Sequence, residues 1–422
     1  MEGLDVKEGQ RVRVHSGEKV YEGLVMPSPK DTVVVKLDSG YNIGIPAEEV
    51  SKVVPVPIEE IPQKVAPPTT PIVTSKELPR VSIISTGGTI ASRVDYRTGA
   101  VTSQFDAEDI LGEIPELANL ATYNAHLAYN ILSENMLPEY WQKLAEEVYS
   151  QIEGGTEGVV ITHGTDTMGY TAAALSFMLS SPVPIVLVGS QRSSDRPSSD
   201  AAMNALCAVK VALSDIAEVS VVMHKESSDT SCLAHRGCKV RKMHTSRRDA
   251  FKSINAPPLA VIHYPSLKLE KLDEHRRRGE VKLDIHNNLD EKCCIIKYTP
   301  GASSDIIDYY VDKGYRGIVL EGTGLGHVGR HWLGAIKRAV DEGVIVVVTS
   351  QCLYGRVCDR VYDTGRDMLK AGIIEGEDML PEVALVKLMW LLANYPPEEA
   401  KKLVKENLVG EINRRISHDY YP

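Results

Sequence analysis

The spacing of apolar residues divides the chain into parts with different predicted architectures. Between residues 7 and 54 the apolar residues form short β-like runs, and turn signals such as Ser16-Gly17 separate them. The runs cover residues 11–16, 19–26, 32–40 and 41–46. This spacing predicts a small SH3-like or OB-like β-barrel over residues 1–54, a fold that specifies no function by itself.

The next segment, residues 55–79, contains seven prolines. Each proline lacks a backbone N–H and fixes φ, so the segment is predicted to be a semi-extended linker and not a packed element. From residue 80 onward, short apolar runs alternate with helical patterns. This alternation predicts an α/β fold with mostly parallel sheets that are covered by helices on both faces.

The α/β region divides into two predicted domains, at 80–270 and 291–422, because the segment 264–292 between them is polar and irregular. The strand-like runs of the first domain are 81–84, 158–162, 184–189 and 219–223, with helices at 138–151 and 199–214. Those of the second domain are 293–298, 317–322 and 344–350, with helices near 303–313, 330–342 and 381–394.

Composition narrows the class of protein. The chain has 422 residues with a formal net charge of −10, which disfavours nucleic-acid binding over the whole surface. No apolar run reaches the length of a membrane span, and residues 1–20 lack the apolar core of a signal peptide. The odd number of cysteines, seven, favours reduced thiols. We therefore expect a cytoplasmic location.

The first candidate site follows the strand 81–84, where the chain reads Ser85-Thr86-Gly87-Gly88-Thr89. Glycines allow positive φ and let a ligand approach the backbone N–H groups. Ligands of open α/β sheets bind at the carboxyl ends of the strands. Thr89 could act there as a nucleophile if a nearby base removes its proton, or it could simply cap the next segment.

The second candidate site follows the strand 158–162, where His163-Gly164 leads into Thr165, Asp166 and an alanine-rich helix. Thr165 and Asp166 are both good N-cap residues, so a capped helix is one interpretation. The other is that two strands, each ending in Gly-Thr, bring two hydroxyls and a carboxylate to one edge of the sheet. The pattern alone leaves both interpretations open.

These two segments carry a resemblance. STGGTIAS (85–92) and VVITHGTDTM (159–168) resemble the signature regions of the bacterial-type L-asparaginases, and ILSENM (131–136) and VRKMHTSRRDAFKSIN (240–255) are similar to two further segments of that family. The resemblance implies a two-domain asparaginase-like body that cleaves a side-chain amide through a threonine acyl-enzyme. It assigns catalysis and substrate binding to seven residues: Thr89, Thr165, Asp166 and Lys242 as catalytic, and Ser133, Glu134 and Gly88 as substrate-binding.

The barrel and the proline-rich linker, together with the segment around Lys242, resemble the GatD family, the D subunits of archaeal-type glutamyl-tRNA(Gln) amidotransferases. This resemblance implies that the chain hydrolyses glutamine and supplies ammonia to an E subunit of the GatE type. That partner would bind Glu-tRNA(Gln) and use ATP and Mg²⁺, while this chain would hold no cofactor and no metal. A homodimer core within a heterotetramer is implied, without a membrane.

Two departures from the family patterns concern the lid and the second domain. The lid tyrosine would be Tyr96 in a shifted register, and GTGLGHVGRH (322–331) lacks the asparagine of the corresponding asparaginase segment. The rival functions are a stand-alone asparaginase or glutaminase and a non-catalytic scaffold that acts through its barrel. The choice between glutamine and asparagine, and which threonine attacks first, stay open.

Three further patterns are weaker. The spacing Gly324-x-Gly326-x-x-Gly329 matches a dinucleotide fingerprint, but the following strand ends without an acidic residue, so we expect a loop at the active-site crevice. Cys232, His235, Cys238 and His244 have the residue types of a zinc site in an uncommon spacing. Seven basic residues between 236 and 252 could face RNA or a partner, lie on a solvated face, or form ion pairs across a subunit interface.

Overall fold

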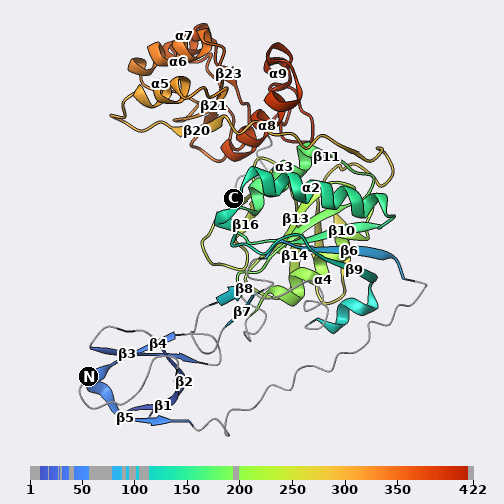
Figure 1. The fold of residues 1–422 in the computed structure, drawn as a ribbon, viewed down its shortest axis with the longest axis vertical. Coiled ribbons are helices and arrows are strands. Elements are labelled where there is room, and N and C mark those ends of the chain that lie inside the picture. Colours follow the sequence, from blue (N-terminus) through green and yellow to red (C-terminus); the bar gives the residue numbers. More distant parts are fainter. Residues whose placement is uncertain are drawn as a thin grey trace.

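The protein forms a small antiparallel barrel-like domain and two α/β domains (Figure 1). The computed structural model describes residues 10–17, 19–26, 28, 31–37, 42–56, 78–87, 92–94, 101–103, 114–192 and 199–416. Most of the predicted linker, residues 57–77, lies outside the described residues. The predicted fold class, an asparaginase-like α/β body preceded by a small β-barrel, is confirmed.

The N-terminal domain is a five-stranded antiparallel sheet in the order β4-β3-β2-β1-β5. Its strands are β1 (Arg11–Ser16), β2 (Lys19–Met26), β3 (Thr32–Leu37), β4 (Asn42–Pro46) and β5 (Val50–Pro55). A short 3₁₀ helix, η1 (Ala47–Glu49), returns the chain so that β5 pairs with β1. Alternate residues of the strands, among them Val12, Val14 and Val35, face inward and form the small core.

The middle domain is built on an eight-stranded sheet in the order β18-β17-β14-β13-β12-β10-β6-β9. Its strands are β6 (Arg80–Ser85), β9 (Thr122–Leu127), β10 (Gly158–Thr162), β12 (Ile185–Val188), β13 (Val219–His224), β14 (Ser231–Arg236), β17 (Ala260–His263) and β18 (Lys268–Lys271). The strands from β9 to β13 are parallel, whereas β14, β17 and β18 are antiparallel. The sheet is therefore mixed, and its antiparallel half was not predicted.

Helices cover both faces of this sheet, as the sequence predicted. Three helices do so: α2 (Pro138–Glu153), α3 (Met168–Met178) and α4 (Ala201–Ala212). In Figure 1, α2 and α3 lie on one side of the sheet and α4 on the other. The inner parallel strands β10 and β12 are continuous apolar runs because both of their faces are buried, and each is buried along its whole length.

Short elements complete the middle domain. They are the hairpins β7 (Ser92–Val94) with β8 (Val101–Ser103) and β15 (Val240–Lys242) with β16 (Phe251–Ser253), the pair β11 (Leu179–Ser180) with β19 (Asp284–Ile285), and the 3₁₀ helices η4 (Pro115–Asn119) and η5 (Ser133–Asn135). The segment 264–292 was expected to be irregular, and this was wrong in part. It contains β18, which extends the large sheet, and β19, which pairs with β11.

The C-terminal domain is a four-stranded parallel sheet in the order β20-β21-β22-β23. Its elements are β20 (Cys293–Lys297), α5 (Asp305–Asp312), β21 (Gly317–Gly322), η6 (Arg330–Trp332), α6 (Leu333–Asp341), β22 (Ile345–Ser350), α7 (Asp363–Ala371), β23 (Ile374–Glu375), α8 (Pro381–Asn394) and α9 (Pro397–Leu403). The strands and helices predicted here from alternating patterns all occur, with ends shifted by at most a few residues.

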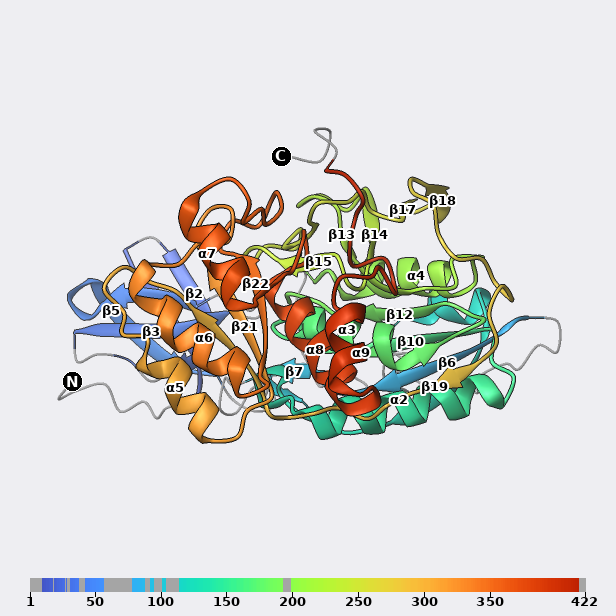
Figure 2. The same cartoon turned by 90° about the horizontal axis from the view of Figure 1, so that it is seen from above.

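Helix α8 joins the two α/β domains. It packs against α3 of the middle domain and against β20 and β21 of its own domain, so nearly all of its residues are buried. Figures 1 and 2 both show α8 beside α3. The rings of Phe177 on α3 and Trp390 on α8 stack with their centroids 6.0 Å apart. A helix that is apolar on all sides is stable only in such a buried position.

Candidate active site

The first candidate segment leaves the sheet at the carboxyl end of β6, beside the end of β10. Ser85 is opposite Thr162 in the parallel pair, and Thr86 donates its backbone N–H and its Oγ1 to the Thr162 carbonyl, at 3.0 and 2.8 Å. Gly87 has φ +99°, and a Cβ there would lie 2.6 Å from the carbonyl oxygen of Ile131. Only glycine fits this close approach. Gly88, Thr89 and Tyr96 lie outside the described residues.

The second candidate segment meets Lys242 at the same edge of the sheet. Lys242 Nζ donates to Thr165 Oγ1 at 2.8 Å and to Asp166 Oδ1 at 2.7 Å. Lys242 ends β15, whereas Thr165 and Asp166 belong to the loop between β10 and α3. Thr165 is buried and the Lys242 side chain is 14% exposed, but the Asp166 carboxylate is 65% exposed. The group therefore has a solvent-facing carboxylate and a shielded hydroxyl.

This arrangement suits proton transfer. A threonine hydroxyl becomes a nucleophile, or can activate water, only when a neighbouring group accepts its proton. An ammonium that donates to both a hydroxyl and a carboxylate can hand a proton on, and only after it has done so can its amine accept the proton of the hydroxyl.

The side chains of Thr165 and Asp166 do not cap α3. The N-cap residue is Thr167, and it makes no side-chain capping hydrogen bond. Thr167 Oγ1 donates instead to the carbonyl of Ser133, at 2.8 Å. Because Thr165 and Asp166 contact Lys242, the capped-helix interpretation does not describe their side chains. The other interpretation also needs the hydroxyl of Thr89, which lies outside the described residues.

The predicted substrate-binding residues Ser133 and Glu134 lie beside this loop, on η5. Ser133 is buried, and a Cβ on Gly164 would lie 2.6 Å from the Ser133 Cβ. Gly164 is therefore required for the contact between η5 and the loop that carries Thr165. The Glu134 side chain is exposed. Thus the structure brings Ser133, Glu134, Thr165, Asp166 and Lys242 to one edge.

A buried hydrogen-bond chain that was not predicted supports the Thr165 loop. Trp141 Nε1 donates to Thr171 Oγ1 at 2.9 Å, and Thr171 Oγ1 lies 2.8 Å from His163 Nε2. His163 Nδ1 lies 2.7 Å from the Gly164 carbonyl, which can only accept, so Nδ1 carries the hydrogen and Thr171 donates to Nε2. Burial lowers the pKa of His163 to about 4, so the ring is neutral at pH 7.

All seven basic residues between 236 and 252 are paired with acidic side chains. The pairs are Arg236 with Glu218 and Asp273, Lys239 with Asp378, Arg241 with Glu382, Lys242 with Asp166, Arg247 with Asp249, Arg248 with Asp229, and Lys252 with Asp249. Ion pairing within the chain, which was not among the predicted interpretations, describes this stretch.

The cysteines and histidines of the possible zinc pattern have separate partners. Cys232 Sγ donates to Asn204 Oδ1 at 3.4 Å, Cys238 Sγ donates to the Val409 carbonyl at 3.3 Å, and His235 Nδ1 lies 2.8 Å from Ser253 Oγ. Within the described ranges, no cluster of three or more His, Cys, Asp or Glu side chains could hold a metal ion. Every helix in those ranges is too short or too polar to cross a lipid bilayer.

Comparison with known proteins accounts for nearly the whole chain. A family model described as "Asparaginase, N-terminal" matches residues 80–274, "Glutaminase/Asparaginase C-terminal domain" matches 292–404, and "GatD N-terminal domain" matches 6–55. The chain is 60% identical to the D subunit of the glutamyl-tRNA(Gln) amidotransferase of Archaeoglobus fulgidus, over 96% of this chain and 95% of that relative. The chain belongs to the family of amidotransferase D subunits.

Other members of the D-subunit family are nearly as similar. The D subunit of the Methanosarcina mazei amidotransferase is 56% identical, over 97% of this chain and 99% of that protein. Solved L-asparaginases are similar to a smaller share of this chain. The thermostable L-asparaginase from Thermococcus kodakarensis has a TM-score of 0.71 and 33% identity, covering 80% of this chain and all of that one. The N-terminal barrel therefore separates the D-subunit family from this asparaginase.

Proposed function

We propose that this chain is the glutamine-hydrolysing subunit of a glutamyl-tRNA(Gln) amidotransferase. The observation that carries the proposal is the contact of Lys242 with Thr165 and Asp166 in a chain that belongs to the D-subunit family. The hydrolysis releases ammonia, and a partner subunit uses that ammonia to convert Glu-tRNA(Gln) to Gln-tRNA(Gln).

The proposed reaction has two steps. The Thr89 hydroxyl adds to the side-chain amide carbon of glutamine, the C–N bond breaks, and the leaving nitrogen takes up a proton and departs as ammonia. Water then attacks the threonine ester, which releases glutamate and restores the hydroxyl. Thr165, Asp166 and Lys242 move the protons or orient the water, and the N–H groups near Gly88 stabilise the oxyanion. Ser133 and Glu134 bind the α-carboxylate and α-amine of the substrate.

The partner proposed for this chain is an E subunit of the GatE type. We assign to it most of the contacts with tRNA, together with ATP and Mg²⁺, because the seven clustered basic residues of this chain are already paired with its own acidic side chains. The assembly we propose is a heterotetramer around a homodimer of this chain, acting in the cytoplasm where tRNA is charged.

An ammonia-release assay tests the function. It compares glutamine with asparagine, for the chain alone and for the chain with its partner, ATP, Mg²⁺ and Glu-tRNA(Gln). We expect glutamine-dependent formation of Gln-tRNA(Gln) and slow hydrolysis until partner and tRNA are present. The Thr165→Val variant should lose both, whereas Thr122→Val, at the opposite edge of the sheet, should lose neither.

Two outcomes would contradict the proposal. Fast hydrolysis of asparagine by the chain alone, unchanged by partner and tRNA, would assign it the activity that the names of its solved structural relatives carry. Full Gln-tRNA(Gln) formation by both Thr89→Val and Thr165→Val, with no acyl-enzyme trapped, would leave the chain as a scaffold.

A further inference from the structure

The strand that ends in Lys242 has two faces with different partners. Side chains alternate along a strand, so Arg241 points to one side while Val240 and Lys242 point to the other. Lys239 is the turn residue directly before this strand. Val240 is buried in the core beside α3, and Lys242 reaches Thr165. A Cβ on Gly169, at the start of α3, would lie 3.2 Å from the Val240 carbonyl, so strand and helix are in close contact.

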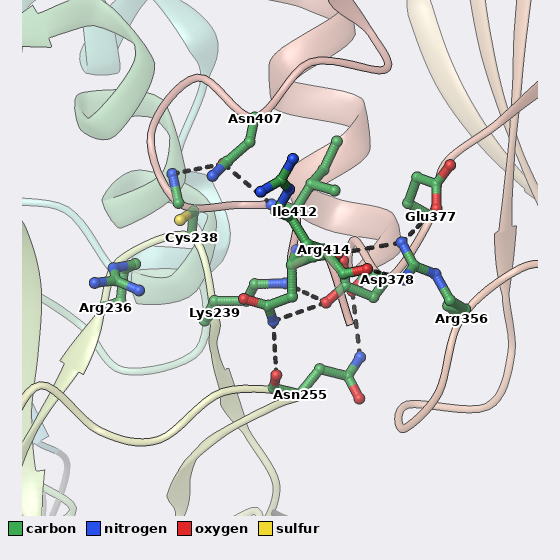
Figure 3. Close-up of polar contacts among 12 residues, drawn as sticks. Arg236, Cys238, Lys239, Asn255, Arg356, Glu377, Asp378, Asn407, Ile412 and Arg414 are labelled. Atoms are coloured by element: carbon green, nitrogen blue, oxygen red, sulfur yellow. Dashed lines mark hydrogen bonds and ion pairs between the residues drawn. The ribbon is translucent and has the colours of Figure 1, made fainter. Parts of the chain in front are cut away.

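The other face of the strand is bound to the C-terminal domain. Arg241 Nη1 donates to both carboxylate oxygens of Glu382 on α8, at 3.1 and 2.8 Å. Lys239 Nζ donates to Asp378 Oδ2 at 2.8 Å, and both of these side chains are almost fully buried. Figure 3 shows Lys239 and Asp378 pointing toward each other across the junction of the domains.

The C-terminal side of this junction is itself held in place. Asp378 Oδ1 accepts from the Asn413 backbone N–H and Oδ2 accepts from the Asn413 amide, both at 2.9 Å. The same amide donates to the Asn255 carbonyl at 2.7 Å, and the Ile254 N–H donates to the Lys239 carbonyl at 2.8 Å. These contacts form a closed ring from the Lys242 strand through the C-terminal domain and back.

We propose that Lys239, Arg241, Asp378 and Glu382 are positioning residues for amide hydrolysis, through which the C-terminal domain sets the location of Lys242. This inference rests on the proposed function and assigns the domain junction a part in it. Lys242 lies at hydrogen-bond distance from both Thr165 and Asp166, so a shift of the strand would lengthen these contacts or force the side chain into another rotamer. A displacement of about 1 Å at a catalytic group can reduce a rate by about 100-fold.

The two ion pairs differ in what their loss would do. Removal of either Lys239 or Asp378 would leave an unpaired charge in a buried site, so such variants could fail to fold. The Arg241 side chain is 37% exposed, so its removal leaves no buried cation. Burial raises the pKa of Glu382, which the nearby Arg241 opposes, so Glu382 can take up a proton when Arg241 is replaced. Arg241 is therefore the better residue to test.

The test measures steady-state glutamine hydrolysis by the full complex with Glu-tRNA(Gln), for Arg241→Met, Glu382→Gln, the double variant and Arg241→Lys. The matched control is Arg338→Met. Arg338, on α6, is 38% exposed and donates to Asp308, on α5, at 2.7 Å. Both helices belong to the C-terminal domain, so this ion pair does not cross the domain junction. Thermal unfolding and the amount of folded complex are measured for every variant.

We expect each single loss variant to lower kcat by about 10- to 100-fold with KM changed by less than about twofold, since Ser133 and Glu134 lie on another element. The double variant should be no worse than either single variant, because the two residues act as one contact. Arg241→Lys, which keeps the charge, should recover most of kcat, and Arg338→Met should match the unmodified complex.

The inference is overturned if Arg241→Met and Glu382→Gln retain kcat, if their losses multiply in the double variant, or if activity falls only with the amount of folded protein. The proposed function still holds in these cases if the unmodified complex hydrolyses glutamine and the Lys242→Met variant does not. If the unmodified complex itself hydrolyses no glutamine, the proposed function and this inference fail together.

Discussion

The carboxyl ends of the parallel strands in the two α/β domains carry polar side chains in opposite states of pairing. In the middle domain, Lys242 lies within 2.8 Å of both Thr165 and Asp166. In the C-terminal domain, Asp359 follows β22 and is fully buried, and within the described part of the chain neither of its carboxylate oxygens accepts a hydrogen bond. His327 Nε2 lies 3.6 Å from Asp359 Oδ1.

Burial and pairing distinguish the first edge, where we propose the reaction, from the second. The carboxylate of Asp166 is mostly exposed, so a substrate can reach a charged group whose partner is already in place. Burial, together with the charge of Glu375, raises the pKa of Asp359 to about 7, and burial lowers the pKa of His327. Both groups of the second edge therefore favour their neutral forms. The topology places polar side chains at the carboxyl ends of the strands, but the hydrogen-bond and charge partners of those side chains determine their chemistry.

The largest effect that this comparison predicts comes from removing the cation of the first edge. Lys242→Met should lower kcat/KM for glutamine hydrolysis by about 1,000-fold or more, roughly 4 kcal/mol, because neither Thr165 nor Asp166 keeps its partner. The assay is ammonia release by the complex with Glu-tRNA(Gln). Lys337→Met, which breaks a surface pair with Asp341 at 2.9 Å, is the control and should be fully active. If Lys242→Met were as active as Lys337→Met, the contacts of Lys242 would have no part in the activity, and the first edge would not differ from the second in this respect.

The next largest effect concerns the hydrogen bonds that link Trp141, Thr171 and His163 and support the loop that carries Thr165. Thr171→Val keeps the shape of the side chain but leaves both Trp141 Nε1 and His163 Nε2 buried without a partner. Each unsatisfied group costs about 1–3 kcal/mol, so we expect the free energy of unfolding to fall by about 3 kcal/mol. Urea unfolding at pH 7 measures it.

Ser176→Ala is the control for Thr171→Val on the same helix. Ser176 Oγ donates only to the Ala172 carbonyl within its own helix, so its removal should cost less than about 1 kcal/mol. If Thr171→Val were as stable as Ser176→Ala, the buried chain would have no part in holding the loop that carries Thr165.

The sequence predicted the apolar parallel strands of the middle domain because their signal is local, but it missed the parallel edge strand β9, which mixes polar and apolar residues. The strand ending at Thr162 is a continuous apolar run, which is what burial on both faces requires. The strand β14, with the sequence SCLAHR, mixes polar and apolar residues within a buried antiparallel pair, so no period identified it. Propensity and pattern miss such strands because their burial depends on distant partners.

Only those residues of the candidate site that lie in recognisable sequence motifs could be predicted. Thr165 and Asp166 follow a recognisable strand, but Lys242 is 77 positions from Thr165 and only the family resemblance joined them. The support from Thr171 depends on the packing of α2 and α3 over β10, which leaves no mark in the local sequence. The prediction for Thr89 concerns a residue outside the described ranges and stays a prediction.

The smallest effect tests the second edge, through the pH dependence of stability. The folded-state pKa of Asp359, about 7, is above its ordinary value of 3.8. The fold therefore binds the proton more tightly than the unfolded chain. This contribution to stability is fully present below pH 3.8 and is lost as the pH rises through about 7. Asn resembles the protonated carboxyl and cannot ionise, so Asp359→Asn should avoid that loss.

We expect Asp359→Asn to raise the free energy of unfolding by about 2 kcal/mol more at pH 8 than at pH 5. The midpoints of thermal unfolding of the variant and the unmodified protein at the two pH values measure the difference. Asp341→Asn, on the surface in a pair with Lys337, should show no such gain. Equal effects of Asp359→Asn at both pH values would mean that Asp359 is charged and compensated at both. The two edges would then differ in exposure alone, and pairing would not explain why we propose the reaction at only one of them.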